Sequence, residues 1–124
     1  MSLDQITYNI IGCALNVHKI LGCGFQELIY QRALAIEFKD AGISFAREFT
    51  MLIHYKGEII GERRVDFFVE DQVMVELKAI SAIEPVHKTQ AINYLEAYNI
   101  KYGLLINFST PKMEYHRVYN SKLL

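Results

Sequence analysis

The N-terminal third of the chain carries apolar side chains at helical spacing in two consecutive stretches. Apolar residues recur every three or four positions over residues 3–21 and again over residues 25–41. Gly22 and Gly24 stand between the two stretches, and Gly42 follows the second one. Because glycine takes positive φ at little cost and commonly ends helices, the pattern predicts two amphipathic helices joined by a short turn.

Beyond residue 44 the hydrophobic period changes from helical spacing to alternation, which is typical of β-strands. Residues 49–55 and 58–60 flank a Lys56-Gly57 pair, and this arrangement predicts a hairpin. Gly61 interrupts the strand pattern, so we expect a bulge or bend there before a strand over residues 63–70.

The C-terminal half has the pattern of a strand, a helix and a second strand. A strand over residues 72–80 follows a turn at Asp71, Pro85 suits the first turn of a helix, and residues 102–108 form a short apolar run. Since such crossovers are right-handed, we expect the two strands to be parallel within a mixed sheet. Residues 113–119 alternate and predict an additional strand at the sheet edge.

Composition narrows the classes of protein that fit this pattern. The 124 residues are 52% hydrophobic, which predicts one domain, residues 1–124, with a substantial core. Thirteen basic and fourteen acidic residues give a net charge of −1, so the chain lacks the overall positive charge of most nucleic-acid-binding proteins. The apolar stretch over residues 10–18 is far shorter than a membrane span, so no membrane association is expected. Cys13 and Cys23 form no CxxC pair, and we expect reduced thiols in a cytoplasmic protein.

The strands on either side of Asp71 bring candidate chemistry together. Counting outward from a three-residue loop at 70–72 places Asp66 directly opposite Glu76, with Lys78 two residues farther along. Side chains alternate between the two faces of a strand, so a polar face and an apolar face are expected. The polar face is expected to hold Arg64, Asp66, Phe68, Met74, Glu76 and Lys78. The apolar face is expected to hold Val65, Phe67, Val69, Val73, Val75 and Leu77.

Two close carboxylates repel each other unless a cation lies between them. Ligation by carboxylate oxygens suits Mg²⁺ or Mn²⁺, which bind a few acidic ligands together with water and a phosphate group. We therefore take Asp66 and Glu76 as candidate metal ligands. A purely structural interpretation explains the same residues, with Glu76 paired to Lys78 and Asp66 paired to Arg64 on a solvated surface.

Two polar residues on the predicted helices are further candidates for this site. Glu27 falls in the first turn of the second helix, at the margin of a stripe that otherwise packs inward. Gln90 lies with His87 and Tyr94 on one face of the third helix. Each also has an ordinary explanation, since the helix dipole favours a glutamate in the first turn and glutamines are commonly exposed.

Taken together, these residues resemble the ordered motifs of a known family. Residues 24–30 match the GxxExxY signature, and the later motifs are Arg64-Val65-Asp66-Phe67, Glu76-Leu77-Lys78-Ala79 and His87-Lys88-Thr89-Gln90. From about residue 10 to residue 108 the chain resembles the small GxxExxY proteins of the PD-(D/E)XK nuclease superfamily. The resemblance implies an α/β, restriction-endonuclease-like core in which α-helices flank a central mixed β-sheet. The proline that names the superfamily is absent, since Val65 precedes Asp66.

The same resemblance implies a role for each candidate residue. Asp66 and Glu76 would bind Mg²⁺ or Mn²⁺, while Lys78 would position or deprotonate the attacking water and stabilise the pentavalent phosphorane. Glu27 would assist the metal site from its helix, and Gln90 would orient the strand or the substrate.

We therefore expect a Mg²⁺-dependent nuclease that hydrolyses phosphodiester bonds, with DNA as the substrate by family analogy. The alternative is a catalytically silent module that binds nucleic acid or protein on the same fold. The intact Asp66, Glu76 and Lys78 argue against this alternative, whereas the balanced charge weakly favours it. A purely structural protein is a third hypothesis, and a homodimer formed through the predicted edge strand stays open.

Overall fold

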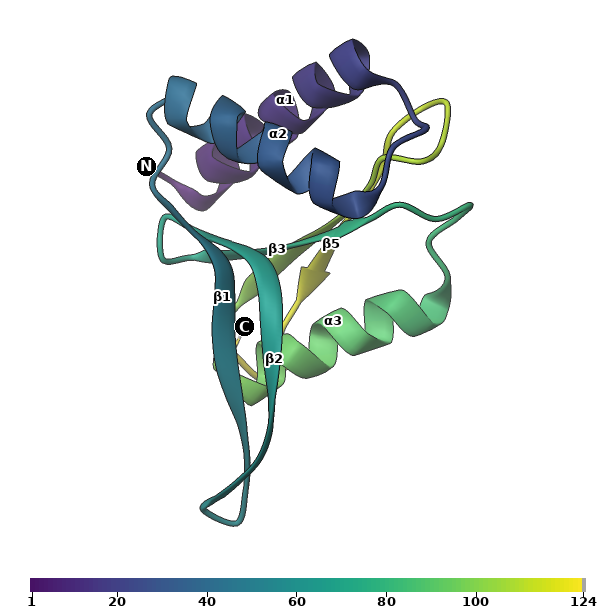
Figure 1. Ribbon diagram of the computed structural model, residues 1–124. Coiled ribbons are helices and arrows are strands. Elements are labelled where there is room, and N and C mark those ends of the chain that lie inside the picture. The colour runs from purple at the N-terminus through teal and green to yellow at the C-terminus, as the bar shows by residue number, and fades with distance from the viewer. Residues whose placement is uncertain (124) are drawn as a thin grey trace.

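The computed structural model describes residues 1–123, which form a mixed five-stranded sheet flanked by three helices (Figure 1). The helices are α1 (Leu3–Leu21), α2 (Glu27–Asp40) and α3 (Pro85–Ala97). The strands are β1 (Phe45–Tyr55), β2 (Glu58–Val69), β3 (Val73–Lys78), β4 (Tyr102–Asn107) and β5 (Glu114–Tyr119). A short 3₁₀ turn over Ser121–Leu123 follows the last strand.

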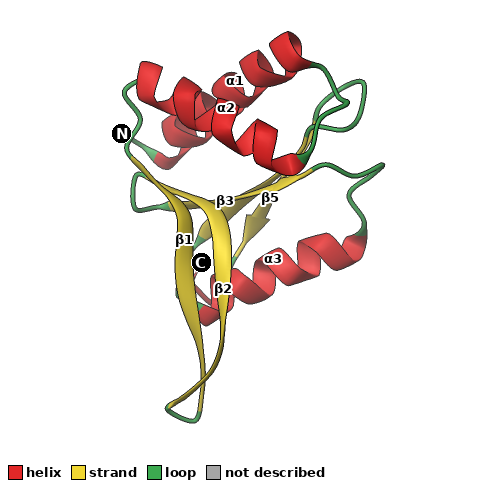
Figure 2. Cartoon of the chain, in the orientation of Figure 1, coloured by secondary structure: helices red, strands yellow, loops and turns green. Residues whose placement is uncertain are grey.

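The strands lie in the order β1-β2-β3-β4-β5, and every neighbouring pair is antiparallel except β3 and β4, which are parallel. Figure 2 shows α1 and α2 together over one side of the sheet and α3 on the other side. The expected parallel crossover and the expected edge strand near the C-terminus are both confirmed. The architecture is the α/β arrangement, with helices on both sides of a mixed sheet, that the resemblance implies.

The helix ends follow from local sequence. The Ser2 side chain accepts a hydrogen bond of 3.2 Å from a first-turn amide of α1, and the helix stops at Gly22, which has a φ of 75°. The second helix begins at Glu27, later than the pattern predicts, because Gln26 is extended and serves as its N-cap. The third helix starts at Pro85 as predicted, since proline has no amide hydrogen to leave unpaired there.

The first hairpin is longer than predicted. Strand β1 begins at residue 45 rather than 49, and the segments expected separately at 58–60 and 63–70 belong to the single strand β2. The expected irregularity near Gly61 is confirmed, because Ile53 pairs with Gly61 while His54 pairs with Ile59. The extra residue of this bulge lets the two strands continue as one twisted arm, which extends away from the rest of the chain (Figure 1).

The hairpin between β2 and β3 has the predicted register, with Val69 opposite Val73. The ladder ends at the pair of Phe67 and Val75, so the strands separate just before Asp66. Pairing of β2 with β1 is also interrupted at Asp66, where the opposing residue, Glu48, has a φ of 53°. Strand β2 therefore bends at Asp66 and leaves β3.

Because of this bend, the side chains of β2 do not divide between the two sheet faces as expected. Phe67 and Val69 pack beneath α1 and α2, whereas Val65 belongs to the core beneath α3 together with Met74. The prediction that Val65 shares a face with Phe67 is wrong because strict alternation holds only along an unbent strand.

Two hydrophobic cores hold the layers together. The larger lies between the sheet and the first two helices, with Tyr30 and Phe38 among its fully buried side chains. The smaller lies between the sheet and α3, with Leu95 and Leu105 fully buried in it. Over residues 1–123, no helix combines the length and the apolar character needed to cross a membrane.

Candidate active site

Asp66 occupies the point where β2 bends away from β3. One carboxylate oxygen, Oδ2, accepts a hydrogen bond of 2.8 Å from the backbone N–H of Leu77. The other, Oδ1, accepts one of 2.8 Å from the side-chain amide of Gln31, a buried residue of α2. The carboxylate thus replaces a strand carbonyl as the partner of Leu77, which keeps that buried amide satisfied and fixes Asp66.

Glu76 lies on the neighbouring strand and is only 2% exposed. Its Oε2 accepts a hydrogen bond of 2.8 Å from Arg63, whose guanidinium lies 5.0 Å from the ring centroid of Tyr94 on α3. Arg63 thereby neutralises part of the Glu76 charge and also packs α3 against the hairpin.

The ion pairs of the purely structural interpretation do not form among residues 1–123. Arg64 was expected beside Asp66, but it is exposed and lies 3.7 Å from Glu48 instead. Lys78 makes no ion pair within 4.0 Å in the part of the chain that the structure describes. The assignment of Arg64 to the polar face is wrong because the bend turns its neighbour, Arg63, toward the site.

Two buried oxygens of this region lack hydrogen-bond partners within the described chain, Oε1 of Glu76 and Oε1 of Gln31. An unsatisfied buried acceptor costs about 1–3 kcal/mol, so such oxygens favour a cation or a donor beside them. Two carboxylates and an amide oxygen form the hard, all-oxygen donor set that Mg²⁺ and Mn²⁺ prefer. In residues 1–123 no three side chains of the His, Cys, Asp or Glu type cluster closely enough to hold an ion, so water and substrate oxygens would complete the shell.

Burial raises the pKa values of both acids near the bend, Asp66 and Glu76. Burial, reinforced by the charge of Asp66, raises the pKa of Glu76 to about 7, although Arg63 and Lys78 oppose the shift. Burial also raises the pKa of Asp66 despite the hydrogen bond from Leu77. A bound cation would relieve this repulsion and lower the pKa of both carboxyls.

Glu27 and Lys78 lie within electrostatic reach of the same acids. Partial loss of solvation, together with the charge of Asp66, raises the pKa of Glu27, and Lys78 and Arg63 partly offset this. Glu27 is the first residue of α2 and its side chain is exposed, while Lys78 is half-buried at the end of β3. The charges of Glu27, Asp66, Glu76 and Lys78 therefore act on one another near the bend.

The third helix, α3, sets the position of Gln90. It is exposed on α3, one turn before Tyr94, and within residues 1–123 no side-chain hydrogen bond links it to Asp66 or Glu76. His87, expected on the same helix face, accepts a hydrogen bond of 2.8 Å from the backbone N–H of Glu84 and so caps the helix. Gln90 shares a helix face with Tyr94, whose ring lies beneath the guanidinium of Arg63, the partner of Glu76.

Comparison with known proteins accords with this geometry. A family profile described as the PD-(D/E)XK nuclease superfamily matches residues 4–118. The chain belongs to this superfamily. Members of the superfamily are usually nucleases. The bend between β2 and β3 is therefore the candidate active site of this chain. No curated protein matches the sequence.

A solved structure shows the same fold. The crystal structure of SSO0001 superposes with a TM-score of 0.59 at 18% identity and covers 73% of this chain. The PD-(D/E)XK chain spans 48% of the length of SSO0001, or about half. Together with the family match, this likeness confirms the restriction-endonuclease-like fold of a mixed sheet between helices.

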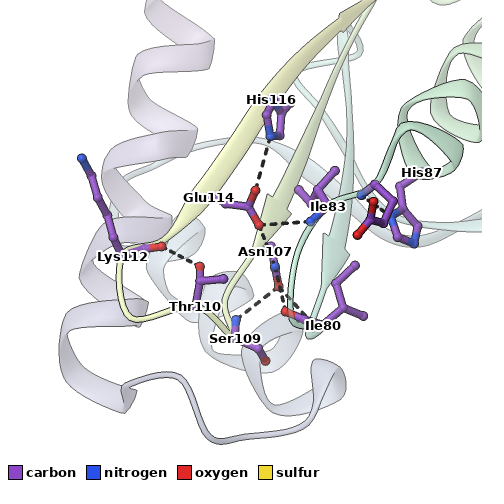
Figure 3. A network of polar contacts seen from close by, with 10 residues as sticks. Ile80, Ile83, His87, Asn107, Ser109, Thr110, Lys112, Glu114 and His116 are labelled. Carbon is purple, nitrogen blue, oxygen red and sulfur yellow. Dashed lines mark hydrogen bonds and ion pairs between the residues drawn. The ribbon is translucent and has the colours of Figure 1, made fainter.

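A polar network anchors the loop that follows β3 in this PD-(D/E)XK protein (Figure 3). Asn107 is fully buried at the end of β4, and its side chain bonds to both the N–H and the C=O of Ile80, at 3.1 and 2.9 Å. It also donates to Glu114 of β5, which in turn accepts from the N–H of Ile83. The hydrogen bond from Asn107 is the main reason that the pKa of Glu114 is lowered.

Sequence reasoning missed several supporting residues. Asn107 could have been noticed, because a single asparagine interrupts an otherwise apolar strand. Gln31 and Arg63 carry no such signal, since each looks like an ordinary polar residue on its own element. Only the packing of α2 and α3 against the bend reveals their contacts.

Proposed function

We propose that this chain is a Mg²⁺- or Mn²⁺-dependent nuclease of the GxxExxY type that hydrolyses phosphodiester bonds of DNA. The observation that carries the proposal is that the charge of Asp66 acts on a buried Glu76 whose Oε1 lacks any partner within the described chain. Burying two repelling carboxylates is unfavourable unless a cation compensates them. The choice of DNA rests on the family resemblance alone.

Residues of β2, β3 and α2 would hold the metal ion. Asp66 and Glu76 would hold the metal ion, which would polarise the phosphate and lower the pKa of a bound water. Leu77 and Gln31 keep Asp66 oriented by their hydrogen bonds, so the donor set needs little rearrangement. Arg63 neutralises one oxygen of Glu76 and leaves the other free for the ion.

Three residues act around that pair. Lys78 would position the attacking water and offset the negative charge that develops on the phosphate. Glu27 would assist the metal site from the start of α2, and Gln90 would orient the substrate from α3. The local cations Arg63 and Lys78 provide positive charge in a chain whose net charge is −1.

Calorimetry with Mn²⁺, combined with cleavage of labelled single-stranded and duplex DNA, tests the proposal. Wild-type protein should bind Mn²⁺ and cleave, and Asp66→Asn should abolish both. Asp71→Asn is the matched control, because it removes an exposed carboxylate from the same hairpin at a left-handed turn position that asparagine tolerates. Binding of Mn²⁺ and DNA without cleavage would support the silent binding module instead, and equal Mn²⁺ binding by wild type and Asp66→Asn would contradict the metal assignment.

A further inference from the structure

Tyr30, the last residue of the Gly-to-Tyr motif, holds the turn between α1 and α2 closed. Its ring is fully buried, and its hydroxyl donates a hydrogen bond of 2.6 Å to the C=O of Gly22. The same hydroxyl accepts one of 3.1 Å from the N–H of Phe25. One side-chain atom therefore joins the first and last parts of the turn that leads into Glu27.

The ring of Tyr30 connects the same turn to the active-site strand. It stacks on Phe108, with the ring centroids 4.5 Å apart and the planes 6° from parallel. The N–H of Phe108 donates a hydrogen bond of 3.0 Å to the C=O of Lys78. Tyr30 thus lies between the turn that precedes Glu27 and the end of the strand that carries Lys78.

Glu27 depends on its backbone for its position. Its side chain is exposed and makes no hydrogen bond or ion pair within residues 1–123, so no side-chain contact holds the carboxylate in place. Within the described residues, the N-cap residue of α2, Gln26, also makes no side-chain capping hydrogen bond. The Tyr30 hydroxyl is accordingly the side-chain group that bonds directly to the turn before Glu27.

We propose that Tyr30 is a positioning residue that holds Glu27 toward Asp66 and Lys78 through its hydrogen bonds to Gly22 and Phe25. This inference rests on the proposed function, in which Glu27 assists the metal site. It gives the spacing between Glu27 and Tyr30 a physical reason, because Tyr30 lies nearly one turn along α2 from Glu27 and its side chain points back toward the helix start.

A double-mutant cycle tests this role. Tyr30→Phe removes the hydroxyl but keeps the ring and its stack on Phe108, and should lower Mn²⁺-dependent cleavage about ten- to a hundredfold by misplacing Glu27. In a Glu27→Gln background the same change should have almost no effect on cleavage, whereas a merely structural role would reduce it equally in both backgrounds. Tyr98→Phe is the matched control, since it removes a buried hydroxyl that has no partner in the described chain, and it should cleave as wild type does.

The outcomes separate this inference from the proposed function. Wild-type protein that neither binds Mn²⁺ nor cleaves would overturn both, while active wild-type protein with additive effects in the cycle would overturn only the role of Tyr30. If Tyr30→Phe does not fold, amide hydrogen exchange of wild-type protein decides the question. Slower exchange at Phe25 than at its neighbours Cys23 and Gly24 would support the clamp, and equal exchange would overturn it.

Discussion

The two ends of the hairpin formed by β2 and β3 differ in almost every physical respect. At the turn, Val69 pairs with Val73 in a regular ladder, and both side chains are buried against α1 and α2. At the open end the ladder stops, a carboxylate takes the place of a strand carbonyl, and Glu76 is buried with one oxygen unpartnered in the described chain. The same pair of strands thus stabilises the fold at one end and carries the candidate chemistry at the other.

This difference shows how a sheet creates a site. A backbone amide that loses its ladder partner must find another, and the side chain that supplies it becomes rigidly oriented. At the bend the required partner is Asp66, so the break in the ladder and the orientation of the acid have one cause. The contrast predicts that substitutions in the regular ladder alter stability alone, whereas substitutions at the open end also alter metal binding and turnover.

The largest effect on stability is expected within the regular ladder, at Phe67, which pairs with Val75. Phe67 is fully buried and packs edge-on against Phe38, with the ring centroids 5.1 Å apart. Phe67→Ala should lower the free energy of unfolding by about 3–5 kcal/mol, measured by urea denaturation. Phe49→Ala, at a residue of β1 that is 38% exposed, is the control and should cost less than half as much. Similar losses for the two variants would contradict the assignment of the regular ladder as the stabilising part of the hairpin.

Substitution of Lys78 probes the open end of the hairpin and leaves both proposed metal ligands in place. Lys78→Ala should reduce the cleavage rate by about 10²–10³-fold, because the charge developing on the phosphate loses a nearby cation. The Mn²⁺ affinity should hold or rise, since the neighbouring carboxylates lose a competing positive charge. Stopped-time cleavage assays and calorimetry measure the two quantities separately. A variant that cleaves at the wild-type rate would mean that Lys78 is only a surface counter-ion.

The metal-free protein should depend on pH through Glu76. Its pKa is raised from an ordinary 4.5 to about 7 on folding, so the folded state holds this proton more tightly than the unfolded state. The associated stability is complete below about pH 4.5 and is lost as pH rises through 7, by on the order of 2–3 kcal/mol. Thermal unfolding from pH 4.5 to 8 should show this loss in wild type and much less of it in Glu76→Gln. Parallel pH profiles for the two proteins would rule Glu76 out as the source.

The smallest predicted effect is a difference in stability between substitutions of two adjacent arginines, Arg63 and Arg64. Arg63→Ala should lower stability by about 1–2 kcal/mol near pH 8, because it leaves the Glu76 carboxylate without its partner, although Arg63 is itself partly exposed. Arg64→Ala removes an exposed pair with Glu48 and should change stability by about 0.5 kcal/mol or less. Equal losses in urea titrations of the two variants would contradict the observed bend of β2.

Local sequence was sufficient for much of the architecture. The stop at Gly22, the start at Pro85 and the opposition of Val69 and Val73 were all predictable, because each depends on turn chemistry or alternation within a few residues. The parallel pairing of β3 with β4 was predictable for a topological reason, namely the hand of strand-helix-strand connections. The ordered motifs in the sequence also indicate the superfamily.

The tertiary structure alone decided how the site is supported. The bend at Asp66 assigns Val65 to the core beneath α3 and turns Arg63 rather than Arg64 toward Glu76, which strict alternation cannot predict. The contacts of Gln31 and Tyr30 join segments that meet only when the helices pack on the sheet. Sequence patterns report which face of a regular element is apolar, whereas these contacts form where an element departs from regularity, and that departure depends on residues distant in the chain.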